Sequence, residues 1–143
     1  MRFSRYLCAL GATFILAPAL AWADLPNLKV TISGAQPATG SIEVTLFNSA
    51  ETFMRSPFLQ ESGDVDENGQ LVVEFFGLAD GDYAVVVIHD ENDNGVLDTG
   101  FLGFGGESIG YSNGADPWLG RPDYEDVIIA VEIENQEIEI NLN

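Results

Sequence analysis

The sequence contains few cysteine, histidine and basic residues, and each shortage narrows the possible functions. It has one Cys, one His, and five Lys and Arg residues against 23 Asp and Glu residues. One cysteine cannot build a disulfide framework, and any His-based catalytic triad or zinc site would rest on His89 alone. With a formal net charge of −18, the chain is a poor partner for nucleic acid and for anionic membrane surfaces.

The longest apolar run, "LCALGATFILAPAL", lies near the N-terminus and is short for a membrane span. Arg2 and Arg5 precede it, and small residues up to Ala23 stand before Asp24. This pattern predicts a secretory signal peptide over the first 23 residues, cleaved after Ala23, and therefore export to the periplasm or the extracellular space. An uncleaved anchor helix is less favoured because Pro18 interrupts the run.

The expected mature chain, residues 24–143, has the length of one domain with one core and contains neither a cysteine nor a membrane span. Its basic residues are Lys29, Arg55 and Arg121, so its formal charge is 3 minus 23, or −20. Such self-repulsion destabilises the compact state unless salt or bound cations screen it. A solubilising surface and a functional acidic patch are both consistent with this composition.

Short stretches with a period of two predict β-strands along most of the mature chain. The stretches are "LKVTIS", "SIEVTLF", "LVVEFFGL", "DYAVVVIHD", "DVIIAVEIE" and "EIEINLN". The fourth is apolar on both faces, which is typical of a central strand. If Asn135 and Gln136 form a hairpin turn between the last two, Glu134 and Glu137 would face each other across it.

The segments between these strands read as turns and loops. "ESGDVDENGQ", residues 61–70, is expected to be an acidic loop that ends in the hairpin-type turn Asn68–Gly69. No ten-residue stretch shows a sustained helical period. Six or seven short strands in one domain predict an all-β fold, a single antiparallel β-sandwich of about seven strands with one long glycine-rich loop.

Four segments resemble known families. "FFGLADGDYAVVV" resembles the Leu-x-x-Gly-x-Tyr entry into a strand of transthyretin-like and Cna-B-type sandwich domains, through Leu78, Gly81 and Tyr83. "YAVVVIHDENDNGVLDTGFLG" and "GYSNGADPWLGRPDYEDVIIAV" resemble the small exported proteins grouped as domain of unknown function 2141. With "VTISGAQPATGSIEVTLFNSAETF", the resemblance covers nearly all of the mature chain. It implies the sandwich and an exported location, and no activity.

The stretch "HDENDNGVLD" at the end of the expected central strand matches the first half of a calcium loop. Counted from Asp90 as position 1, the candidate ligands alternate along the chain: Asp90, Asn92, Asn94, the Val96 carbonyl and Asp98. Gly95 at position 6 allows the sharp turn, but position 12 is Phe101 where a bidentate Glu is expected. The expected calcium affinity is therefore weak, with a dissociation constant of roughly 10⁻⁴ to 10⁻³ M.

A polar turn without metal is the alternative, since Asp and Asn favour turns and cap backbone groups on their own. Calcium is slightly favoured because the loop must anchor one end of a long irregular segment, residues 92–122. That segment carries aromatic residues between glycines, and it could form a glycan- or peptide-binding platform within residues 101–124. The candidate ligand residues are Phe104, Tyr111, Trp118 and Tyr124. The competing interpretation is that these rings cover the open end of the sandwich.

No catalytic residue is assigned. His89 is expected to be a packed or rim histidine, and a small sandwich leaves little room for a deep cleft between carboxylates. The favoured hypothesis is a non-enzymatic binding or envelope-associated module with calcium (Ca²⁺) in the 90–98 loop and a glycan, peptide or envelope protein as partner. A glycan- or peptide-recognition domain is the alternative, and a small hydrolase is the least favoured class.

Overall fold

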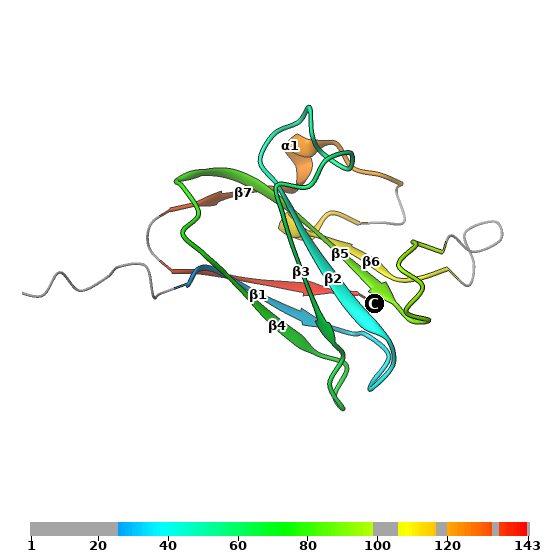
Figure 1. Cartoon of the computed structure of the whole chain (residues 1–143). Helices are drawn as coiled ribbons and strands as arrows, with labels where there is room; N and C mark the ends of the chain where they lie inside the picture. The colour runs from blue at the N-terminus through cyan, green and yellow to red at the C-terminus, as the bar shows by residue number, and fades with distance from the viewer. Residues whose placement is uncertain (1–25, 99–105, 117–119, 133–134, 143) are drawn as a thin grey trace, which may run out of the picture.

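The computed structural model describes residues 26–98, 106–116, 120–132 and 135–142. Within these ranges eight strands form two sheets that lie in separate layers (Figure 1), so the predicted all-β sandwich is confirmed. The expected signal peptide lies outside the described residues. In the described ranges, no helix has the length and the apolar character needed to cross a membrane.

One layer is a three-stranded sheet with the order β4-β1-β8. Its strands are β1 (Pro26–Ser33), β4 (Leu71–Phe76) and β8 (Gln136–Asn141). β1 runs antiparallel to β4 and parallel to β8. The sandwich is therefore antiparallel except for this one pair.

The other layer is a five-stranded sheet built around the longest strand, β5. It contains β2 (Ser41–Phe47), β3 (Leu59–Asp64), β5 (Gly81–Asp90), β6 (Ile109–Tyr111) and β7 (Ile128–Val131). β5 pairs with β2 on one side, and on the other side it pairs with β7 along its first half and with β6 along its second half. The prediction of a central strand is confirmed.

The core lies between the sheets and follows the period-two pattern of the sequence. On β1 and β2, alternate apolar side chains point inward and are 0% exposed: Leu28, Val30, Ile32, Ile42, Val44 and Leu46. Burial of one such side chain contributes about 1.5–3 kcal/mol relative to leaving it exposed. With no disulfide available, this packing holds the domain together.

A second apolar cluster covers only one end of the outer face of the five-stranded sheet. Ala84 and Val86 of β5 point to this face, and Phe47, Phe53, Tyr111 and Val127 pack with them. The covering groups come from residues 48–58, β6 and the single-turn helix α1 (Tyr124–Val127), and the short 3₁₀ helix η2 (Ser112–Gly114) follows β6 directly. Figure 1 shows α1 at one end of β5 and the turn that follows Asp90 at the other end. The outer cluster does not cover the end of β5 at Asp90, and the candidate site lies there.

Three sequence-based expectations for the strands were wrong. β7 and β8 do not form a hairpin, because β7 joins the five-stranded sheet and β8 joins the other. Glu137 faces Lys29 at 3.2 Å, while Glu134 lies outside the described residues. Part of the expected acidic loop 61–70 belongs to the edge strand β3, and β6 interrupts the segment expected to be irregular.

The turn at Asn68–Gly69 is present, but it links the two sheets instead of closing a hairpin. Asp66 Oδ1 accepts the N–H groups of Asn68 and Gln70, each at 2.8 Å. Gly69 has a φ of 75°, and a Cβ there would lie 2.2 Å from the carbonyl oxygen of Ala35. Only glycine fits at this position.

The Leu-x-x-Gly-x-Tyr motif shapes the turn into β5. The hydroxyl of Tyr83 donates to the carbonyl of Ala79 at 3.0 Å, so the ring is tied to the turn that precedes its own strand. Buried Asn27 exchanges two hydrogen bonds with the backbone of Leu78, at 2.7 and 3.1 Å, and this joins β1 to the same turn. The specifically transthyretin-like arrangement stays a prediction.

Candidate functional site

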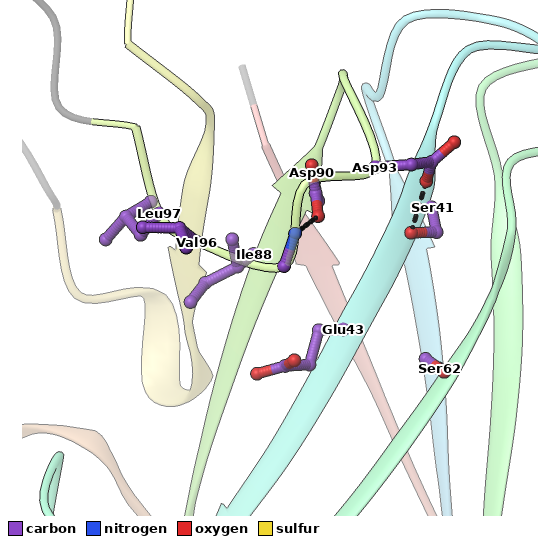
Figure 2. A pocket seen from close by; sticks show the side chains of 9 residues that line it. Ser41, Glu43, Ser62, Ile88, Asp90, Asp93, Val96 and Leu97 are labelled. Atoms are coloured by element: carbon purple, nitrogen blue, oxygen red, sulfur yellow. Dashed lines mark hydrogen bonds between the residues drawn. The ribbon is translucent and has the colours of Figure 1, made fainter.

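The candidate site is the turn that follows β5, residues 90–98. The carboxylate of Asp90 accepts the N–H of Gly95 at 2.7 Å and that of Asn94 at 3.1 Å. Gly95 adopts a φ of 73°, as the glycine at position 6 of the predicted calcium loop requires. The chain therefore folds back over Asp90 (Figure 2).

Three of the predicted ligand side chains meet within this turn. The amide groups of Asn92 and Asn94 both donate to Asp98 Oδ2, at 2.7 and 3.0 Å. Asn94 Oδ1 in turn accepts the N–H of Val96 at 2.7 Å. The side chains at positions 3, 5 and 9 thus converge on one carboxylate oxygen, while the side chain of Val96 is 64% exposed.

Glu107 is a member of the site that the sequence reasoning missed. Its carboxylate accepts the N–H of Glu91 at 3.2 Å and the N–H of Asp98 at 2.9 Å, so one side chain joins the start and the end of the turn. The N–H of Glu107 also donates to the carbonyl of Asp98 at 2.9 Å. The available signal was that Glu107 is the single acidic residue between Asp98 and Asp116.

The turn is fastened to the neighbouring strand β2. Ser41 Oγ donates to Asp93 Oδ1 at 2.8 Å, and Asp93 has a φ of 55°. Gly40, with a φ of 62°, lies so close that a Cβ there would be 2.0 Å from the carbonyl oxygen of Asp90. Asp93, the non-glycine residue of the turn with positive φ, is therefore held by a direct contact with β2.

The hydrogen bonds of the turn favour the ionised form of Asp90. The N–H of Gly95 is the main cause that lowers the pKa of Asp90 below its ordinary value, and it outweighs partial desolvation. Across the described ranges, no three His, Cys, Asp or Glu side chains are gathered as a metal site. Any cation here would depend on amide and backbone carbonyl oxygens beside the carboxylates, and such ligands suit calcium.

His89 is packed, as predicted. Its side chain is 1% exposed, and Nε2 lies 2.8 Å from the carbonyl oxygen of Thr39, to which it donates. Nδ1 is 3.8 Å from a carboxylate oxygen of Glu91. A ring held in this way has a structural role at the rim of the core.

Beside the turn lies an open hollow of about 380 Å³ on the outer face of the five-stranded sheet. Its lining combines acidic, hydroxyl and apolar groups from β2, β3, β5 and the turn (Figure 2). The principal lining residues are Glu43, Ser62, Ile88, Asp93, Val96 and Leu97. A second hollow of about 360 Å³ lies near Arg121 and Asp126.

Two of the four aromatic residues of the predicted platform, Tyr111 and Tyr124, lie within the described residues, and both belong to the outer apolar cluster. Tyr111 is 6% exposed within the outer cluster, and burial raises the pKa of its hydroxyl. Tyr124 is half-buried, stacks edge-on against Phe53, and donates to the carbonyl of Asp82 at 2.9 Å. Both rings cover the outer face of the five-stranded sheet, whereas the competing interpretation placed them at the open end of the sandwich. Phe104 and Trp118 lie outside the described residues.

Fold and turn together define a class of protein: an all-β sandwich domain that carries a turn rich in carboxylates and amides at one end of its central strand. The chain belongs to the family described as "Uncharacterized protein conserved in bacteria (DUF2141)", whose sequence model matches residues 30–139. The resemblance to domain of unknown function 2141 is confirmed. No curated protein and no solved structure matches the chain.

Proposed function

We propose that this protein is an exported, non-enzymatic β-sandwich domain that serves as a binding or envelope-associated module and binds calcium weakly in its 90–98 turn. The observation that carries the calcium proposal is the meeting of Asn92 and Asn94 at one oxygen of Asp98, on a turn closed by Asp90 and Gly95. Positions 1, 3, 5, 6 and 9 of the half-motif thus lie together in space.

The turn holds the kinds of atom that calcium selects. Calcium takes six to eight oxygen ligands. The turn offers the carboxylates of Asp90 and Asp98 and the backbone carbonyl of Val96. A half-turn of each amide about its Cβ–Cγ bond exchanges nitrogen for oxygen, so Asn92 and Asn94 can present oxygen to a cation. Glu107 accepts the N–H groups of Glu91 and Asp98, and in this proposal its carboxylate holds the two ends of the turn in place around the ion.

The expected affinity is low for a physical reason. The Asn–Asp bonds already close the turn, and calcium must displace them before it is bound. A dissociation constant of roughly 10⁻⁴ to 10⁻³ M follows, and extracellular calcium is sufficient to fill such a site. The bound charge also offsets part of the self-repulsion of a chain with 23 acidic residues.

Export is proposed from the signal-peptide pattern of the first 23 residues. The proposal that the domain is not an enzyme is supported by the position of His89. Its Nε2 is occupied by the Thr39 carbonyl and its ring is 1% exposed, so it is poorly placed to act as a general base. The alternative, glycan or peptide recognition through residues 101–124, depends on Phe104 and Trp118. It ranks second because Tyr111 is buried.

Titration calorimetry tests the calcium proposal directly. We expect one calcium ion to bind, magnesium to bind more weakly, and both Asp98→Asn and Glu107→Gln to weaken calcium binding by about tenfold. Asp80→Asn is the matched control, because it removes the same charge from an exposed turn at the other end of β5. If Asp98→Asn and Asp80→Asn bind calcium equally, the 90–98 turn is not the site.

A further inference from the structure

The outer face of the five-stranded sheet is covered at one end and open at the other. Phe53 and Val127 lie over the covered end with Ala84 and Val86 beneath them. At the open end, the paired residues of three adjacent strands form a row: Ser62, Glu43 and Ile88. In the described part of the chain, no helix or strand is packed over this row, and the 90–98 turn borders it on one side.

The open end has a mixed chemical character. Ile88 forms an apolar floor, and Val96 and Leu97, 64% and 36% exposed, form an apolar side of the hollow. Glu43 and Asp93 supply carboxylates across from them (Figure 2). A lysine or arginine side chain combines an aliphatic stem with a cationic head, and this is the side-chain chemistry that such a surface complements.

The negative charge at this end is not neutralised from within the described ranges. Lys29 pairs with Glu137 at 3.2 Å, and this ion pair involves neither Glu43 nor Asp93. Arg121 donates to the Phe53 carbonyl over the covered end, and Arg55 belongs to the turn that contains Phe53. Charge complementarity therefore points to a basic partner.

The edge strand β3 gives this surface a shape suited to an extended chain. β3 is the outermost strand beside β2, and five of its six residues are exposed. Ser62 and Glu43 are paired across β3 and β2, so an extended segment that crosses the sheet face along this row, over the edge strand, meets Ser62, Glu43 and Ile88 in turn.

We propose that the open end of this sheet face, the surface formed by Ser62, Glu43, Ile88 and Asp93 with the Val96–Leu97 side, docks an extended basic segment of a partner protein. Its lysine or arginine stems lie on Ile88 and Val96, and their charged heads face Glu43 and Asp93. The inference rests on the proposed role as a binding module and names its partner. It does not require calcium.

Fluorescence anisotropy with short labelled peptides tests this inference, in chelator so that calcium plays no part. A peptide of alternating lysine and valine should bind, with an affinity that falls as salt rises, and a glutamate–valine peptide should not. The double variant Glu43→Gln/Asp93→Asn should weaken binding roughly threefold to tenfold. Val96→Ser should weaken it as well, because it removes the apolar contact.

The matched control is Glu74→Gln/Glu139→Gln, which removes the same charge from the outer face of the three-stranded sheet. The inference is overturned if this control weakens binding as much as the double variant does. It is also overturned if free spermine binds as tightly as the peptide and Val96→Ser has no effect, since diffuse attraction would then suffice. Calcium binding that persists without peptide binding would reject this inference and leave the calcium site intact.

Discussion

Ser112→Ala tests how the central strand is completed. β7 pairs with β5 as far as Ala84 and β6 pairs with it from Val86, so Val85 lies at the gap between them. Its N–H donates to the hydroxyl of Ser112 at 2.9 Å, and that hydroxyl donates to the carbonyl of Val127. One side chain thus replaces the missing ladder bond and connects β5 to α1.

The expected cost follows from burial. Ser112 is 1% exposed, so the alanine variant leaves the Val85 N–H and the Val127 carbonyl without this partner and away from water. An unsatisfied buried polar group costs about 1–3 kcal/mol, and we expect the free energy of unfolding to fall by about 2 kcal/mol. For a domain of this size, the melting temperature should fall by roughly 5–10 °C.

Urea unfolding measures the loss, and amide hydrogen exchange locates it at Val85. Ser62→Ala is the control, because Ser62 is exposed on the edge strand and should change stability by no more than about 0.5 kcal/mol. The reasoning is refuted if the two variants are equally stable, or if the Val85 amide keeps its protection in Ser112→Ala.

Three further substitutions probe the turns. Gly40→Ala and Gly77→Ala both place a side chain at positive φ, but only at Gly40 would the new Cβ meet backbone, 2.0 Å from the carbonyl oxygen of Asp90. Thermal melts should therefore show Gly40→Ala to be less stable than Gly77→Ala by more than about 1 kcal/mol. Equal melting temperatures of the two variants would contradict this reasoning. The Gln70 N–H lowers the pKa of Asp66 in the folded protein below its ordinary value of 3.8. The ionised carboxylate therefore stabilises the fold at pH values above 3.8, and this contribution is lost as the pH falls through the lower pKa of the folded state. Urea unfolding across pH should show Asp66→Ala less stable at neutral pH and the gap narrowing in acid; a gap independent of pH would be inconsistent with it.

The strands that could be predicted are those whose side chains alternate between core and solvent. β1, β2 and β5 were found close to their actual bounds because one or both faces are buried. β3 was missed because its mostly exposed residues have no alternation to detect, and β6 because three residues are too few. Local periodicity also does not state which sheet a strand joins, and so β7 and β8 were taken for a hairpin.

The candidate turn was predictable in part for a similar reason. The spacing from Asp90 to Asp98 is local, and the structure brings those side chains together. Glu107 approaches from beyond the turn because β6 returns alongside β5, and this pairing is a tertiary feature without a local signature. The burial of Tyr111 likewise depends on β6, which the glycine-rich sequence conceals.

The calcium-dependent melting curve tests the central claim most directly. With a dissociation constant of roughly 10⁻⁴ to 10⁻³ M, calcium at about 10 mM should stabilise the folded state by about 1.4–2.7 kcal/mol through mass action. The melting temperature should then rise by roughly 5–10 °C relative to chelator. Magnesium at matched ionic strength should give a clearly smaller rise, and Asp98→Asn should lose the calcium effect. A melting temperature that is the same in calcium, magnesium and chelator at matched ionic strength would contradict the account.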